Sequence, residues 1–140
     1  MTDVGDPLAA LHAVISEIID LVQEVKQARW KASAPGALHA ELDRLFEDVR
    51  GWARLLVETD EQRGDAPLAS MPSGSSRTPP NLWPGTVTAD EVRDVLDQQL
   101  DRLGRHVETA RSEQQDEPLR SALGDVERGV VAHRLALSAL

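Results

Sequence analysis

Hydrophobic residues recur at intervals of three and four along four separate stretches of this chain. That spacing places them on one face of an α-helix. In the first stretch it predicts a helix over about residues 7–31, whose apolar face consists of Leu8, Leu11, Ile15, Ile18, Ile19, Val22 and Val25. Asp6 and Pro7 mark its start, because an aspartate can cap the first turn and proline lacks only an N–H that has no helical partner there.

The second stretch predicts a helix over about residues 35–63, following an Ala-Pro-Gly turn at 34–36. Its apolar face consists of Leu38, Leu42, Leu45, Val49, Trp52 and Leu56. A charged row, centred roughly 140° from that face on a helical wheel, consists of His39, Asp43, Glu47, Arg50, Arg54 and Glu58. The row therefore faces away from the core, and the simplest interpretation is a solvated surface. Phe46, Leu55 and Val57 also lie off the apolar face, which would suit an oligomer interface.

Two further helices are predicted, over about residues 88–112 and 117–139. The first of these opens with Thr88-Ala-Asp-Glu91, a capping-box pattern in which the threonine and the glutamate satisfy each other's backbone N–H groups. Between the second and third helices, residues 64–87 contain five of the eight prolines and three glycines, which indicates a crossover rather than a helix. We expect the apolar residues of this crossover to anchor it against the bundle: Leu68, Met71, Leu82 and Trp83.

Four helices joined by a short, a long and a short connection are typical of the ferritin-like bundle. We therefore predict an all-α fold: one ferritin-like four-helix bundle over residues 1–140, with a long crossover between its second and third helices. Gly104, Gly124 and Gly129 fall inside predicted helices, where each costs ~1 kcal/mol relative to alanine, so they indicate close contacts between helices. His133 lies on the apolar face of the last helix and is expected to be packed in the core or an interface.

The net charge and the lack of cysteine limit the partners and the metal ligands that this chain can have. With 24 acidic against 15 basic residues, the net charge is −9. Such a surface attracts cations and repels nucleic-acid phosphates and anionic membranes, so direct DNA binding is not expected. The chain has no cysteine, so a metal site would be built from histidines and carboxylates. The N-terminus lacks a basic leader pattern and no apolar run reaches the ~18 residues of a membrane span, so we expect a soluble, cytoplasmic protein.

Two runs of the sequence resemble a known family. The run KQARWKASAPGALHAELD, residues 26–43, resembles the signature of the Dps-type mini-ferritins, which is usually close to KQAHW followed by LHxxxD. The run RLLVETDEQRGDAPLASM, residues 54–71, is similar to the family's DxxAERxxxLGGxPL segment. The last two predicted helices are similar to the family's third and fourth helices. The resemblance implies a homo-oligomer, a twelve-subunit hollow shell that oxidises and stores iron.

The resemblance also implies where iron would be oxidised. In this family the ferroxidase centre spans a two-fold dimer interface, with one set of ligands from each subunit. His39, Asp43 and Glu58 keep residue types that bind iron. Arg29 stands at the position of a ligand histidine and Arg54 at that of a ligand aspartate. A guanidinium has five donors and no lone pair for a metal, so the ligand set is incomplete.

We therefore hypothesise a degenerate centre in which Arg–carboxylate pairs replace the metal and help to hold the dimer. Arg29 continues the apolar face of the first helix and is predicted on a buried face. There its guanidinium must pair with a carboxylate, which Asp43 could supply, or extend out to solvent. Arg54 and Glu58 are four residues apart on one helix and can pair in the same way.

Three functions stay open on the sequence alone. The first is an iron-binding, iron-sequestering shell with weak or lost ferroxidase activity. The second is a non-catalytic structural relative that keeps the fold and the dimer interface, and the third is an enzyme of unrelated chemistry on the same scaffold. A dimer and a dodecamer both remain compatible with the pattern.

Overall fold

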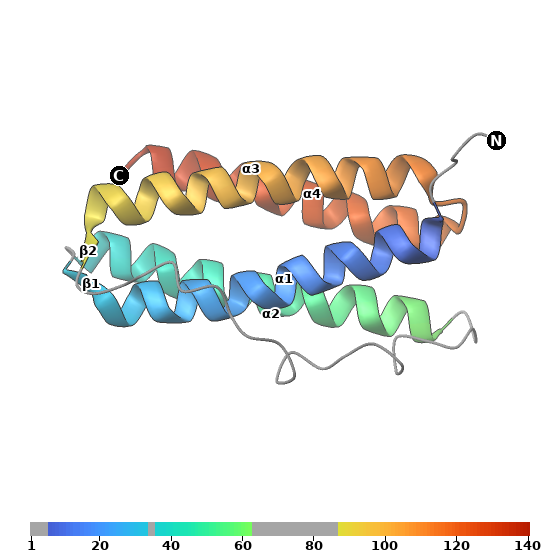
Figure 1. The fold of residues 1–140 in the computed structure, drawn as a ribbon, viewed down its shortest axis with the longest axis horizontal. Helices are drawn as coiled ribbons and strands as arrows, with labels where there is room; N and C mark the ends of the chain where they lie inside the picture. Colours follow the sequence, from blue (N-terminus) through green and yellow to red (C-terminus); the bar gives the residue numbers. More distant parts are fainter. Residues whose placement is uncertain (1–5, 34–35, 63–86) are drawn as a thin grey trace.

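Four long helices pack side by side in one bundle (Figure 1). A computed structural model describes residues 6–33, 36–62 and 87–140. The helices are α1 Pro7–Lys31, α2 Gly36–Glu61, α3 Ala89–Glu113 and α4 Glu117–Ser138. The predicted all-α four-helix bundle is therefore confirmed. Of the predicted crossover 64–87 only Val87 is described; its expected anchors Leu68, Met71, Leu82 and Trp83 lie outside the described residues.

The helices occupy the corners of a square. α1 packs against α2 and α3, and α4 packs against α3 and α2. Figure 1 shows that α2 and α3 run in the same direction, so the end of α2 and the start of α3 lie at opposite ends of the bundle. This is the ferritin-like connectivity, in which one connection must return the full length of the bundle.

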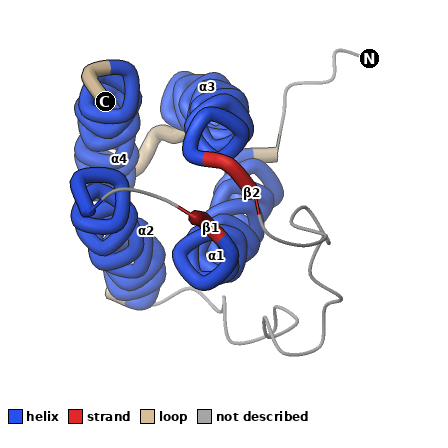
Figure 2. The backbone as a smooth tube through the Cα atoms, turned by 90° about the vertical axis from the view of Figure 1, so that its left-hand side faces the viewer, coloured by secondary structure: helices blue, strands red, loops and turns tan. Residues whose placement is uncertain are grey.

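A short parallel pairing was not predicted. β1, Ala32–Ser33, pairs with β2, Val87–Thr88, in the register Ala32 to Val87 and Ser33 to Thr88. It links the end of α1 to the start of α3 at one end of the bundle (Figure 2). Two residues are too few to show the alternation by which a strand is recognised in a sequence.

The helix starts follow the predicted capping signals. The Asp6 carboxylate accepts a hydrogen bond from the Leu8 N–H at 3.0 Å. At α3 the Thr88 hydroxyl accepts from the Glu91 N–H at 3.2 Å, while the Glu91 carboxylate accepts from the Thr88 N–H at 3.1 Å. The capping box is therefore complete, and it fixes the start of α3 next to β2.

The predicted apolar face of α2 is buried along its whole length, from Leu38 to Leu56. It meets the buried residues of the other three helices in a single core. At its centre Trp52 lies against the backbone of α4: a Cβ added at Gly129 would stand 2.6 Å from the Trp52 ring. Gly104 of α3 faces Val130 at 3.3 Å by the same measure. The close helix contacts predicted from these two glycines are confirmed.

No helix in the described ranges is long and apolar enough to cross a membrane.

Replacing Gly129 with alanine should destabilise the bundle, because the new methyl group would overlap the buried Trp52 ring. We expect a loss of about 1–3 kcal/mol in the free energy of unfolding, measured by urea denaturation. Gly51→Ala is the matched control, since nothing lies within 4 Å of its added Cβ and it sits inside α2. That control should gain up to about 1 kcal/mol from helix propensity. Equal effects of the two substitutions would contradict the contact.

Candidate metal centre

An arginine–carboxylate pair stands where the sequence resemblance places metal ligands. The last turn of α1 carries Arg29 and the second turn of α2 carries Asp43. The Arg29 Nε–H donates to Asp43 Oδ1, and the Arg29 Nη2 donates to Asp43 Oδ2 at 3.3 Å. The guanidinium therefore engages both carboxylate oxygens, which are the atoms that a metal ion would bind.

The electrostatics of the pair follow from this geometry. The hydrogen bond from Arg29 lowers the pKa of the Asp43 carboxyl, and the positive charge of Arg29 contributes in the same direction. The hydrogen bond to Asp43 in turn raises the pKa of Arg29. Both groups therefore stay charged, and the Arg29 guanidinium already neutralises the carboxylate that a metal ion would need.

His39 lies one helical turn before Asp43 on α2. Its Nε2 is 3.4 Å from the Ala32 carbonyl oxygen, at the start of β1. With the proton on Nε2, the ring donates to this carbonyl and keeps a lone pair on Nδ1. His39 and Asp43 are thus the two predicted ligands that one chain brings together.

Glu58 lies too far along the same helix to join them. It follows Asp43 by fifteen residues on α2, which at 1.5 Å per residue is roughly 22 Å. Consistent with this, no group of three or more His, Asp or Glu side chains within the described ranges is placed to hold a metal ion. A single chain therefore supplies only part of the predicted ligand set.

The expectation that Arg29 would be buried is wrong. Its side chain is 46% exposed and that of Asp43 is 53% exposed. Ala28 takes the last buried position of α1. Arg29 lies in the final turn, at the edge of the buried face, and its long side chain extends to the exposed Asp43 of α2. The next residue, Trp30, is 77% exposed, so this end of α1 also presents an aromatic side chain to solvent.

The expected pairing of Arg54 with Glu58 is likewise not found. Both residues are exposed on α2, and no ion pair joins them in the part of the chain that the structure describes. On a helix surface such a pair is worth only about 0.3–0.5 kcal/mol, and an arginine placed before its carboxylate is the less favourable order. Arg54 and Glu58 therefore both face outward without engaging each other.

Four buried polar residues were not predicted from the sequence. Glu24, Glu41, Asp60 and Gln114 are each no more than 6% exposed. A signal was available, because Glu24 is three residues after Leu21 and Glu41 three after Leu38, so both glutamates sit on apolar faces. The burial expected for His133 is confirmed.

His133 is held between two carboxylates of α2. Its Nε2 lies 2.6 Å from Asp48 Oδ2, and its Nδ1 lies 3.5 Å from Glu41 Oε1. The Trp52 ring meets the imidazole edge to face, with 6.0 Å between centroids. This cluster ties α4 to α2 from inside the bundle, and it is a structural contact rather than part of the predicted centre.

Comparison with solved structures identifies the fold. The bundle is similar to Dps92 from Deinococcus radiodurans, with a TM-score of 0.79 and 19% identity over 98% of this chain and 86% of that chain. It is also similar to Dps from Microbacterium arborescens in the high iron form, with a TM-score of 0.76 and 18% identity over 95% and 93% of the two chains. The chain has the Dps-type ferritin-like fold.

No protein-family model matches the sequence, and no curated protein matches it significantly. The similarity to Dps proteins therefore lies in the arrangement of the backbone rather than in the sequence. Within this Dps-type fold, the two arginines of the candidate centre are exposed, and one of them engages Asp43.

Glu24 gives the bundle a pH-dependent stability. Burial between α1 and α3, reinforced by the charges of Asp20 and Glu17, raises the pKa of this carboxyl from 4.5 to about 7. A raised pKa in the folded state favours the protonated form, so this contribution is complete below about pH 4.5 and is lost as the pH rises through about 7.

Glu24→Gln should abolish this loss, because glutamine does not ionise. Relative to the variant, the wild type should lose up to about 3 kcal/mol of unfolding free energy between pH 5 and pH 8, measured by urea denaturation. Glu108→Gln, an exposed position on α3, is the control and should behave as the wild type. The same pH dependence in Glu24→Gln and the wild type would show that Glu24 is not responsible.

Proposed function

We propose that this protein forms a homo-oligomeric Dps-type assembly that sequesters iron, with weak or lost iron-oxidising activity. The observation that carries the proposal is the Arg29–Asp43 pair within a Dps-type fold. The fold supplies the scaffold, and the pair accounts for a weakened oxidation site.

Iron sequestration is supported by charge. Each chain carries a net charge of −9, which raises the local concentration of cations around an assembly of many copies. One structural neighbour is a Dps in a high iron form, and we extend that association with iron to this chain as part of the proposal. In this role iron is cargo held by carboxylates on the surface of an assembly.

Weak oxidation is supported by the chemistry of the ligand positions. Ferrous iron needs lone-pair donors that carry negative or neutral charge. Arg29 and Arg54 offer neither, and each adds a positive charge near a carboxylate that remains. His39 and Asp43 also need ligands from elsewhere, because Glu58 of the same chain lies roughly 22 Å away along α2. A second copy with its α2 antiparallel to the first would bring a Glu58 beside them.

A second candidate is a structural assembly that does not handle iron. The bidentate Arg29–Asp43 contact favours it, since the pair can hold the surface without any metal. The two candidates differ in whether the assembled protein retains iron.

Restoring the two ligands should restore oxidation. In Arg29→His with Arg54→Asp, we expect ferrous iron under air to be oxidised at least about tenfold faster than in the wild type, followed by ferric absorbance. The matched control is Arg29→His with Arg50→Asp, which makes the same charge change one turn earlier on the exposed face of α2. Rapid oxidation by the wild type would refute the proposed loss.

Iron retention separates the two candidates. After loading and gel filtration, the iron that stays with the protein should be well above one atom per chain if it sequesters iron. A wild type that elutes without iron would favour the structural assembly.

The proposal also requires an oligomer. Size-exclusion chromatography with light scattering should give a mass well above the 15.3 kDa of one chain; twelve copies would give about 184 kDa. A monomer at micromolar concentration would contradict both candidates, because each of them is an assembly of several copies of the chain.

A further inference from the structure

A cluster of arginines lies at the end of the bundle where α3 ends and α4 begins. A pocket of about 200 Å³ at this end is lined by three arginines, Arg111 of α3 and Arg120 and Arg128 of α4, together with Glu117, Ser121 and Gly124. Figure 1 places this end of the bundle opposite to the one where α1 ends. The cluster is therefore separate from the candidate metal centre, and it is unusual in a chain with a net charge of −9.

Two of the guanidinium groups converge on one point. A Cβ added at Gly124 would stand 3.6 Å from Arg128 Nη1 and 3.7 Å from Arg111 Nη1. The other terminal nitrogens of both groups are already engaged: Arg111 Nη2 with Glu127 at 3.2 Å, and Arg128 Nη2 with Asp125. In the part of the chain that the structure describes, no acceptor is found for either Nη1.

This convergence calls for a negative group. Two guanidinium groups repel each other, and the carboxylates paired with them, Glu127 and Asp125, contact Nη2 rather than Nη1. The third arginine is only loosely held, since Arg120 Nη1 lies 3.8 Å from Glu117. Glu117, Asp125 and Glu127 compete for these arginines, but ion pairs on an exposed surface are weak.

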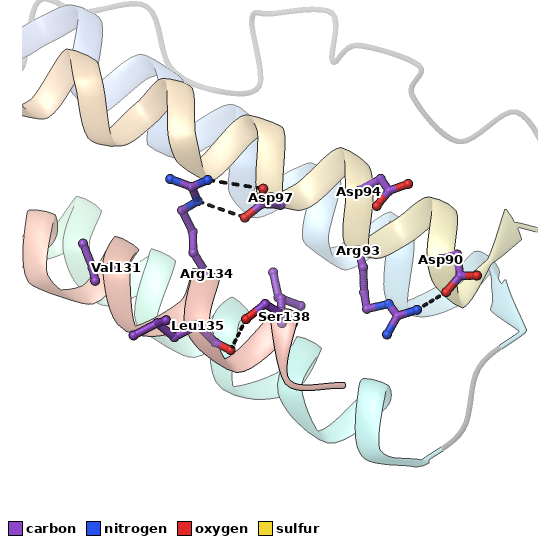
Figure 3. Close-up of a pocket in the computed structure, with 9 residues that line it drawn as sticks. Asp90, Arg93, Asp94, Asp97, Val131, Arg134, Leu135 and Ser138 are labelled. Atoms are coloured by element: carbon purple, nitrogen blue, oxygen red, sulfur yellow. Dashed lines mark hydrogen bonds and ion pairs between the residues drawn. The ribbon is translucent and has the colours of Figure 1, made fainter.

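A second groove between α3 and α4 also contains arginines, but there they are paired with carboxylates of the chain (Figure 3). There Arg134 is held by Asp97 at 2.9 Å and by Asp101 at 3.0 Å, so its donors are occupied by the chain itself. Arg93 pairs with Asp90 in the same groove. Gly124 has no side chain, and Nη1 of Arg111 and Nη1 of Arg128 both lie next to the space that a side chain would fill. Among the glycines of the described residues, this arrangement occurs at Gly124 alone.

We infer that the pocket above Gly124 binds a small tetrahedral oxyanion such as inorganic phosphate. Phosphate oxygens accept from planar guanidinium groups in a fixed geometry, which is why arginine is used for phosphate recognition. Arg111 and Arg128 donate from two different helices, and Ser121 provides a hydroxyl at the rim. Bound phosphate would neutralise the repulsion and fasten the end of α3 to the start of α4.

The inference is tested by titrating the whole protein with sodium phosphate in an isothermal calorimeter, with sodium chloride at equal ionic strength as the reference. Iron is left out, so the result does not depend on the proposed function. We expect saturable binding to phosphate, one ion per chain, and none to chloride. Equal responses to the two salts in the wild type would overturn the inference.

Gly124→Ala is the decisive variant. Its methyl group would make ordinary van der Waals contacts with the two Nη1 atoms, so the variant should fold, and alanine should raise the melting temperature. The same methyl group fills the space that a phosphate oxygen needs, so binding should be lost. A variant that is more stable yet binds phosphate as the wild type does would refute the site.

Arg128→Gln should weaken phosphate binding about tenfold, because it removes one charged donor. Arg93→Gln is the matched control, since it also removes an exposed-face arginine paired three residues back on its own helix. That control should bind phosphate with unchanged affinity. An equal loss in both variants would mean that phosphate responds to total charge and not to this pocket.

Discussion

The structure depends on one constraint: four apolar faces, one from each helix, must share a single core. This constraint decides the rotation of every helix about its own axis, and so it also decides which side chains point outward. On α2 it buries Leu38 through Leu56 and leaves the charged row outside. The tightest contact, Trp52 against the backbone at Gly129, sets how closely α2 and α4 approach. The candidate centre and the arginine pocket are both built from what remains on the surface.

The electrostatics of the candidate centre are the opposite of those that a metal site needs. A metal centre needs several acceptors converging on one cation, whereas here the cation is the Arg29 side chain and Asp43 is its acceptor. Because of this pairing, Asp43 stays ionised and both of its carboxylate oxygens accept hydrogen bonds. Arg29 and Arg54, at the positions that the resemblance assigns to metal ligands, are both exposed, so the bundle does not have to bury either charge.

How much could be predicted differs between local and non-local features. The helix positions, the capping box at Thr88 and Glu91, and the close approach at Gly129 all follow from residue types at short spacing. The burial expected for Arg29 is wrong, because Arg29 lies at the edge of the buried face in the last turn of α1, where its long side chain extends to the exposed Asp43. The expected Arg54–Glu58 pair failed because four-residue spacing permits a contact without making it favourable.

The sequence by itself determined the four amphipathic helices, their starts, and the chemical identity of the groups at the candidate centre. Those properties are local, being fixed by the period of the helix and by which atoms can donate or accept. Three contacts were decided only by the tertiary structure. Arg29 donates to both oxygens of Asp43. His133 lies between Glu41 and Asp48, and the Nη1 atoms of Arg111 and Arg128 both lie close to Gly124. These contacts join different helices, and their geometry depends on how each helix is rotated and shifted against its neighbour, which periodicity within one helix does not specify.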